Sequence, residues 1–299
     1  MKGLTAFFFF GNYFYGICAV ALAIEASLQQ GQSLNSLSFY AMLFIGTVLF
    51  YSYPYVRRVK GYSANPRTQW YQRHYILVRN TQIIYTIALA IGSSVFLYHY
   101  GYRAMHLSWM NSFLVVVFPL VAALYYGLSI FPTAFNLRKV GWLKPYLIGF
   151  TWAGAVTIYP VLLHSIVKGQ EHVFDFFDLF LFIKNFLFVS LLCIMFDVKD
   201  YAADHSGDIK TYVVKYGLRK TIFGILMPMI IGGLAALVIY GVNRHFNPLR
   251  IDVNVIPFLL LLLAAWSLRK RRPLIYYYTR IDGLMLVKAI CGSVAAFLF

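Results

Sequence analysis

Residues 187–208 read LFVSLLCIMFDVKDYAADHSGD, a long apolar run that ends abruptly in a cluster of carboxylates. Asp197, Asp200, Asp204 and Asp208 are four of the ten acidic residues in the chain, and they follow one another at spacings of three, four and four. On a helix these spacings place all four side chains on one face. Because like charges at i,i+4 repel, we expect a cation opposite them. Hard oxygen ligands of this kind suit Mg²⁺, which binds through one or two carboxylates, substrate phosphates and water; a solvated acidic loop is the simpler alternative.

The composition identifies the class of protein. Hydrophobic residues make up 61% of the 299 residues and charged residues only 12%, about half the charged fraction of a soluble domain. The mean hydropathy is +0.68. We therefore expect an all-α, polytopic membrane protein that forms a single domain over residues 1–299.

Apolar segments long enough to cross a bilayer, about 17 to 25 residues, can be placed nine times. Gly11 and Asn12 interrupt the first segment, for which a cleavable signal peptide is the alternative. The predicted segments are residues 6–26, 38–56, 77–98, 109–131, 146–167, 177–197, 221–242, 254–269 and 282–298.

The net charge of +16 is distributed as a topology signal. A nucleic-acid-binding protein gathers its basic residues on one water-facing surface, whereas here they lie in short runs between apolar segments. The loops after segments two, four, six and eight hold most of the Lys and Arg, and the alternate loops hold few. By the positive-inside rule we expect a cytoplasmic N-terminus, an outer C-terminus and a cytoplasmic Asp cluster, in the inner membrane of a cell, with membrane lipids and no nucleic acid as partners.

The nine-segment plan with an Asp-rich loop after segment six resembles the UbiA superfamily of intramembrane prenyltransferases. Residues 197–204, with Asp197, Asp200 and Asp204, look like the family's second motif, D-x-x-D-x-x-x-D, and Lys210-Thr211 and Gly217 follow it as in the family. A second match runs from Arg138 to Trp152-Ala153. The resemblance covers most of the chain.

This resemblance implies a helical bundle around a central cavity open to the cytoplasm. It also implies transfer of an isoprenoid from a prenyl diphosphate to a lipid-soluble acceptor, such as an aromatic quinone precursor, with Mg²⁺. By position, Asp197, Asp200 and Asp204 would be the catalytic metal ligands. The candidate substrate-binding cations are Lys210, Arg57, Arg58, Lys60, Arg138 and Lys144.

The chain departs from the family after segment two. The family carries a first carboxylate motif there, whereas this chain reads FYSYPYVRRVK at residues 50–60 and holds no Asp or Glu between Glu25 and Glu171. Arg57, Arg58 and Lys60 would instead bind phosphate directly. Two functions therefore stay open: a prenyltransferase with one metal motif and a basic clamp, and a non-catalytic relative that binds an isoprenoid or lipid or serves as a subunit of a membrane assembly. A small-anion or lipid transporter is the third hypothesis.

Two lysines lie inside apolar segments. We expect Lys184 to extend toward the outer interface beside Asp178, and Lys288 to reach the cytoplasmic interface or Asp282. Asn12 near a segment end is expected to form interhelical hydrogen bonds or to line a site. The cysteines Cys18, Cys193 and Cys291 are expected to be small core residues.

Overall fold

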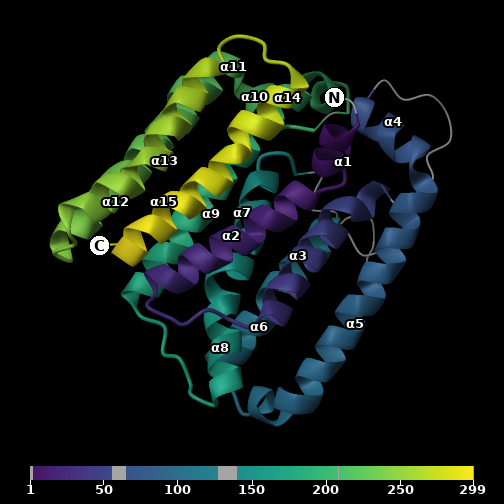
Figure 1. Ribbon diagram of the computed structural model, residues 1–299. Helices are drawn as coiled ribbons and strands as arrows, with labels where there is room; N and C mark the ends of the chain where they lie inside the picture. The colour runs from purple at the N-terminus through teal and green to yellow at the C-terminus, as the bar shows by residue number, and fades with distance from the viewer. Residues whose placement is uncertain (1–2, 56–64, 127–139, 208, 299) are drawn as a thin grey trace.

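The computed structural model describes residues 3–55, 65–126, 140–207 and 209–298, and all regular structure in these ranges is helical (Figure 1). The helices before the acidic cluster are α1 (Leu4–Phe10), α2 (Tyr13–Gln29), α3 (Leu37–Ser52), α4 (Pro66–Arg73), α5 (Tyr75–Met105), α6 (Trp109–Tyr126), α7 (Lys144–Ala153) and α8 (Tyr159–Lys168). From there on they are α9 (Phe176–Ser206), α10 (Tyr212–Tyr216), α11 (Leu218–Lys220), α12 (Met227–Asn243), α13 (Pro248–Ser267), α14 (Leu274–Tyr276) and α15 (Gly283–Leu298).

Seven helical stretches among the described residues are long and apolar enough to cross a membrane. α1 and α2 form an eighth candidate, bent by 58°. α6 is a shorter apolar helix, and its predicted continuation to residue 131 lies outside the described residues. The structure thus confirms a multi-pass, all-helical membrane protein, while the count of nine spans stays a prediction.

Three spans contain a π-helical turn: Gly154–Ile158 joins α7 to α8, Thr221–Leu226 joins α11 to α12, and Tyr277–Ile281 joins α14 to α15. The start of the last span is therefore Leu274, not residue 282, because this turn carries the helix on through Tyr277 and Tyr278. π-Helical turns are rare in proteins, and those that do occur are frequently found at functional sites. The turn at 277–281 lies against α9, which carries the acidic cluster.

The core packs around α9, α7, α2 and α15. The most extensive helix contacts are those of α9 with α7, of α2 with α15 and of α15 with α13, and these helices lie side by side in Figure 1. α5, in contrast, buries none of its most apolar window. Ile84, Ile87 and Ile91 are among its exposed apolar side chains, as expected for lipid-facing residues, whereas Leu89 and Phe96 line an apolar cavity.

The break between α1 and α2 has a local cause. Asn12 adopts the left-handed conformation, with φ 65°, which Asn tolerates better than most residues. A Cβ atom at Gly11 would lie 2.5 Å from the Phe7 carbonyl oxygen, so only glycine fits there. Together these two residues turn the chain and direct Asn12 into the protein interior, where it is fully buried.

Candidate functional site

The acidic cluster, predicted as a loop after a segment that ends at residue 197, is helical, because α9 extends to Ser206. We call this end of the bundle the motif end. Asp197 is 1% exposed and Asp204 8% exposed, while Asp200 is partly exposed. Asp208 lies outside the described residues. The three described carboxylates therefore share one helix, and the first and last of them, Asp197 and Asp204, face the protein interior.

Lys144 supplies the cation expected opposite the cluster. Its Nζ donates to Asp197 Oδ1 at 2.7 Å, and Asp204 lies close enough to interact with it electrostatically. The second oxygen of Asp197, Oδ2, is buried and has no hydrogen-bond partner among the described residues. A buried carboxylate oxygen without a partner is costly, so this oxygen fits a site for an additional donor or cation.

Asp200 pairs with its neighbour Lys199, whose Nζ lies 3.0 Å from Asp200 Oδ1. The same ammonium lies 4.9 Å from the ring centre of Phe196 and 6.0 Å from that of Tyr278. Tyr278 is fully buried, and its hydroxyl has no hydrogen-bond partner among the described residues. Lys199 thus extends from the acidic helix toward the π-helical turn of the last span.

Facing this turn is a buried polar group at the junction of α1 and α2. Asn12 Nδ2 donates to Ser52 Oγ at 2.8 Å and to the Tyr71 hydroxyl at 3.0 Å. The Tyr71 hydroxyl in turn donates to the Phe10 carbonyl at 2.6 Å. Burial raises the pKa of the Tyr71 phenol, and the neighbouring Arg67 guanidinium offsets part of that rise. The interhelical role expected for Asn12 is confirmed.

Arg67 completes this group and was not identified from the sequence. Its Nη2 donates to Asn12 Oδ1 at 2.5 Å, and its guanidinium lies 4.8 Å from the ring centre of Tyr55, which stacks on Tyr71 at 4.3 Å. The buried Nε of Arg67 has no hydrogen-bond partner among the described residues. Asn65 caps the start of α4 and Pro66 is its first residue. This capping signal places Arg67 in the first turn of α4, at the site.

A pair of stacked tyrosines connects the motif end to the membrane interior. The Tyr15 hydroxyl donates to Asp282 Oδ2 at 2.6 Å, and its ring stacks on Tyr51 at 4.8 Å. Trp152 Nε1 donates to the Tyr51 hydroxyl at 2.7 Å. Tyr278 of the last span packs against Phe10 and Phe196, with ring centres 5.8 and 5.7 Å apart, so α1, α9 and the last span meet at one polar site.

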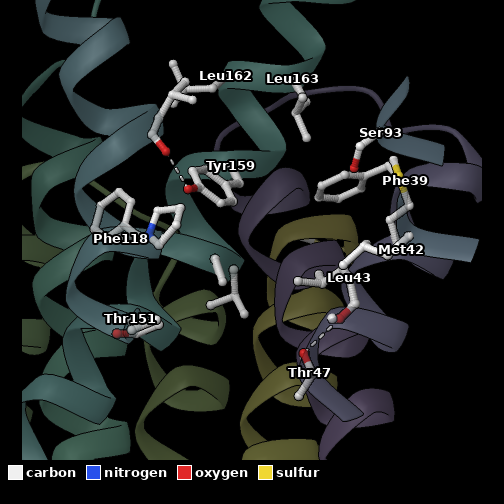
Figure 2. Close-up of a pocket in the computed structure, with 18 of the residues that line it drawn as sticks. Phe39, Met42, Leu43, Thr47, Ser93, Phe118, Thr151, Tyr159, Leu162 and Leu163 are labelled. Carbon is white, nitrogen blue, oxygen red and sulfur yellow. Dashed lines mark hydrogen bonds between the residues drawn. The ribbon is translucent and has the colours of Figure 1, made fainter. Parts of the chain in front are cut away.

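Tyr51 and Trp152 also line a large apolar cavity. The cavity has a volume of about 810 Å³ and lies among α3, α5, α6 and the α7–α8 span. In Figure 2, Phe39 and Met42 of α3 face the same space as Tyr159 of α8. Three hydroxyls in the cavity lining are internally satisfied: Thr47, Thr151 and Tyr159 donate to backbone carbonyls at 2.8, 2.9 and 2.7 Å. These walls therefore suit a hydrocarbon ligand.

The remaining predicted cations are placed less closely. Lys210 is exposed, although its backbone packs on Gly141, where a Cβ atom would lie 2.5 Å from the Lys210 carbonyl carbon. Thr211 beside it is fully buried, and its hydroxyl has no hydrogen-bond partner among the described residues. The predicted ligands Arg57, Arg58, Lys60 and Arg138 lie outside the described residues.

A second charged cluster lies inside the bundle, away from the motif end. Glu25 Oε2 accepts from Lys288 at 2.7 Å, and Glu25 Oε1 lies 3.4 Å from Lys184 Nζ. Gln29 donates to Glu25 at 2.6 Å and accepts from Lys184 at 2.8 Å. A Cβ atom at Gly292 would lie 2.3 Å from Glu25, so glycine makes room for this network on α15.

This cluster shows that both predictions for the intramembrane lysines were wrong. Lys184 points inward to Glu25 rather than outward, and Asp178 instead accepts from His172 at 2.8 Å. Lys288 pairs with the same Glu25, and Asp282 accepts from Tyr15. The physical reason is that Glu25 offers a buried counter-charge, which no pattern along the sequence connects to residues more than 150 positions away.

The described residues contain no group of three or more His, Cys, Asp or Glu side chains arranged to hold a metal ion. A Mg²⁺ site needs only one or two carboxylates when substrate phosphates complete the coordination. Asp197 Oδ2, buried without a partner, and the partly exposed Asp200 fit that smaller requirement.

Comparison with protein-family models, with curated proteins and with solved structures finds no match for this chain. The functional argument therefore rests on the residues and their geometry.

Proposed function

We propose that this protein is an intramembrane prenyltransferase of the UbiA type, which transfers an isoprenoid from its diphosphate to a lipid-soluble acceptor, such as an aromatic quinone precursor. One observation carries the proposal: an apolar cavity of about 810 Å³ is lined by Tyr51 and Trp152, and Tyr51 stacks on Tyr15 of the polar site. A long hydrocarbon chain with a charged head needs this combination of an apolar cavity and a polar end.

In this proposal the isoprenoid chain occupies the cavity and the diphosphate lies at the motif end. Mg²⁺ would be held by Asp197 and Asp200, and it would supply charge neutralisation to the diphosphate oxygens. Lys144, Lys199 and Arg67 add fixed positive charge around the leaving group. Lys210, Arg57, Arg58, Lys60 and Arg138 remain candidate diphosphate ligands by position in the sequence.

The reaction breaks the allylic C–O bond, and pyrophosphate leaves with the electron pair. An electron pair of the acceptor then forms the new bond to the allylic carbon, and the acceptor loses a proton. The apolar cavity walls exclude water from the cation. Tyr51, Trp152 and Phe118 line the cavity with aromatic rings, whose faces attract positive charge.

The test is binding of geranylgeranyl diphosphate to the purified protein with and without Mg²⁺. We expect Mg²⁺-dependent binding in the wild type and its loss in Asp200→Asn. Asp252→Asn is the matched control, because Asp252 is an exposed carboxylate on α13. Ala155→Trp, which introduces an indole at the cavity wall, should weaken binding without changing its Mg²⁺ dependence. Binding that ignores both the metal and Asp200 would refute the enzyme proposal.

One observation favours the alternative, a non-catalytic relative that binds an isoprenoid or lipid. Two of the three described carboxylates of the motif are already paired with lysines, Asp197 with Lys144 and Asp200 with Lys199. Such a protein would bind geranylgeraniol as well as the diphosphate, without metal, and would release no pyrophosphate with any acceptor. Measuring both ligands in the same assay separates the two functions.

A further inference from the structure

A second cavity lies at the motif end, between α1, α4 and the start of α14. Its volume is about 590 Å³, within the range of small-molecule sites. It shares no lining residue with the apolar cavity, and Figure 1 shows α1, α4 and α14 gathered at the same end of the bundle. The lining residues used below are Ala6, Phe10, Trp70, Arg73, His74 and Leu274.

The cavity changes from apolar to basic across its depth. Ala6 and Phe10 are buried, and Leu274 is a third apolar residue of the lining. Trp70 forms the wall: its ring lies 6.2 Å from Phe10 and 4.6 Å from the stacked His74. Arg73 is exposed at the rim. An amphipathic gradient of this kind matches the part of a phospholipid where the acyl chains meet the phosphate.

The charge around this cavity is positive. Among the described residues, no acidic side chain lines it and none forms an ion pair with Arg73. The basic run Arg269–Arg272 directly precedes the lining residue Pro273. Within that run Lys270 and Arg271 are exposed. The rim therefore offers the Arg73 cation, with a basic run next to Pro273 in the sequence, and no carboxylate of a described residue competes there with an anion.

We propose that this cavity binds the phosphodiester headgroup of an anionic phospholipid. Arg73 contacts the phosphate, and Ala6, Phe10 and Leu274 contact the glycerol and the first acyl carbons. The distribution of Lys and Arg predicts that the motif end faces the cytoplasm, where the leaflet is rich in anionic lipids. This binding site is separate from the prenyl-transfer site and does not depend on that reaction.

The experiment is native mass spectrometry of the full chain in neutral detergent, titrated with phosphatidylglycerol or phosphatidylcholine. We expect preferential binding of phosphatidylglycerol by the wild type. Arg73→Gln should weaken that binding on the order of five-fold, the effect of one basic residue at an anionic surface. Arg73→Lys should largely retain it. Arg79→Gln is the matched control, because Arg79 is exposed on α5 and does not line the cavity.

Equal binding of the two lipids would overturn the proposal, and so would equal losses in Arg73→Gln and Arg79→Gln. In the last arm of the experiment, soluble glycerol phosphate at millimolar concentration is added as a competitor of phosphatidylglycerol. Failure to compete supports a membrane lipid as the ligand, and effective competition overturns the lipid assignment. Each variant should unfold at a temperature close to that of the wild type in the same detergent. This result would show that a loss of binding is not caused by a loss of fold.

Discussion

Replacing Glu25 by Gln tests whether the charged cluster inside the bundle is as tightly coupled as its geometry indicates. Glu25 is 1% exposed and lies 2.7 Å from Lys288 and 3.4 Å from Lys184, which are themselves 4% and 5% exposed at the side chain. The substitution removes the only negative charge that either lysine contacts within the described residues. Two buried ammonium groups are then left without a counter-charge.

Breaking a buried ion pair by removing one partner costs about 3–5 kcal/mol. The amide oxygen of the new Gln can still accept one N–H, so we expect about 3 kcal/mol for Glu25→Gln, and nearer the upper value for Glu25→Ala. The measurement is reversible unfolding of the purified protein in mixed micelles. Glu171→Gln is the control, because Glu171 is exposed and its bonds to Asn111 and Ser108 need only an acceptor oxygen; it should cost less than about 1 kcal/mol.

A second substitution tests whether Glu25 and the two lysines are coupled. Lys288→Met in the Glu25→Gln background removes one of the uncompensated charges, so the double variant should be more stable than Glu25→Gln alone. If Glu25→Gln unfolds within 1 kcal/mol of the wild type, or if the two substitutions destabilise additively, the cluster is not a buried, charged network and the argument fails.

Two further predictions concern packing and the motif end. Gly154→Ala places a Cβ atom 2.1 Å from the Phe118 ring and should destabilise the fold by about 1–3 kcal/mol in the same unfolding assay, whereas Gly46→Ala, with open space around it, should change stability far less. Lys144→Met leaves the buried Asp197 carboxylate unpaired and should cost about 3–5 kcal/mol, most of which Asp197→Asn in the same chain should restore; a double variant no more stable than Lys144→Met would contradict the pairing.

The apolar cavity and the last span are linked through aromatic residues. Trp152 donates to Tyr51, and Tyr51 stacks on Tyr15, which donates to Asp282. These contacts connect four spans in turn: the α7–α8 span, α3, α2 and the last span. A ligand that displaces Tyr51 would therefore change the contacts of α3 with two other spans at once, which makes this residue a sensitive position for fluorescence or cross-linking probes.

Composition and hydropathy determined the class of the protein by themselves. Long apolar runs that satisfy their backbone hydrogen bonds internally must be helical in a bilayer, so the all-helical membrane fold followed from the sequence. The spacing of Asp197, Asp200 and Asp204 determined only that a helix through them would carry all three on one face, because that depends on local geometry alone. The structure showed that α9 continues through this segment to Ser206.

Only the tertiary structure decided which groups meet. Arg67 contacts Asn12 across 55 positions, Lys144 pairs with Asp197 across 53, and Glu25 binds Lys288 across 263. The sequence around Lys184 and Lys288 has the same hydropathy pattern as that around lysines that extend to a membrane interface. The pattern therefore predicts an interfacial position for both lysines. The deciding term is the cost of an unpaired charge in the protein interior, and that cost depends on helix packing, which no local pattern in the sequence describes.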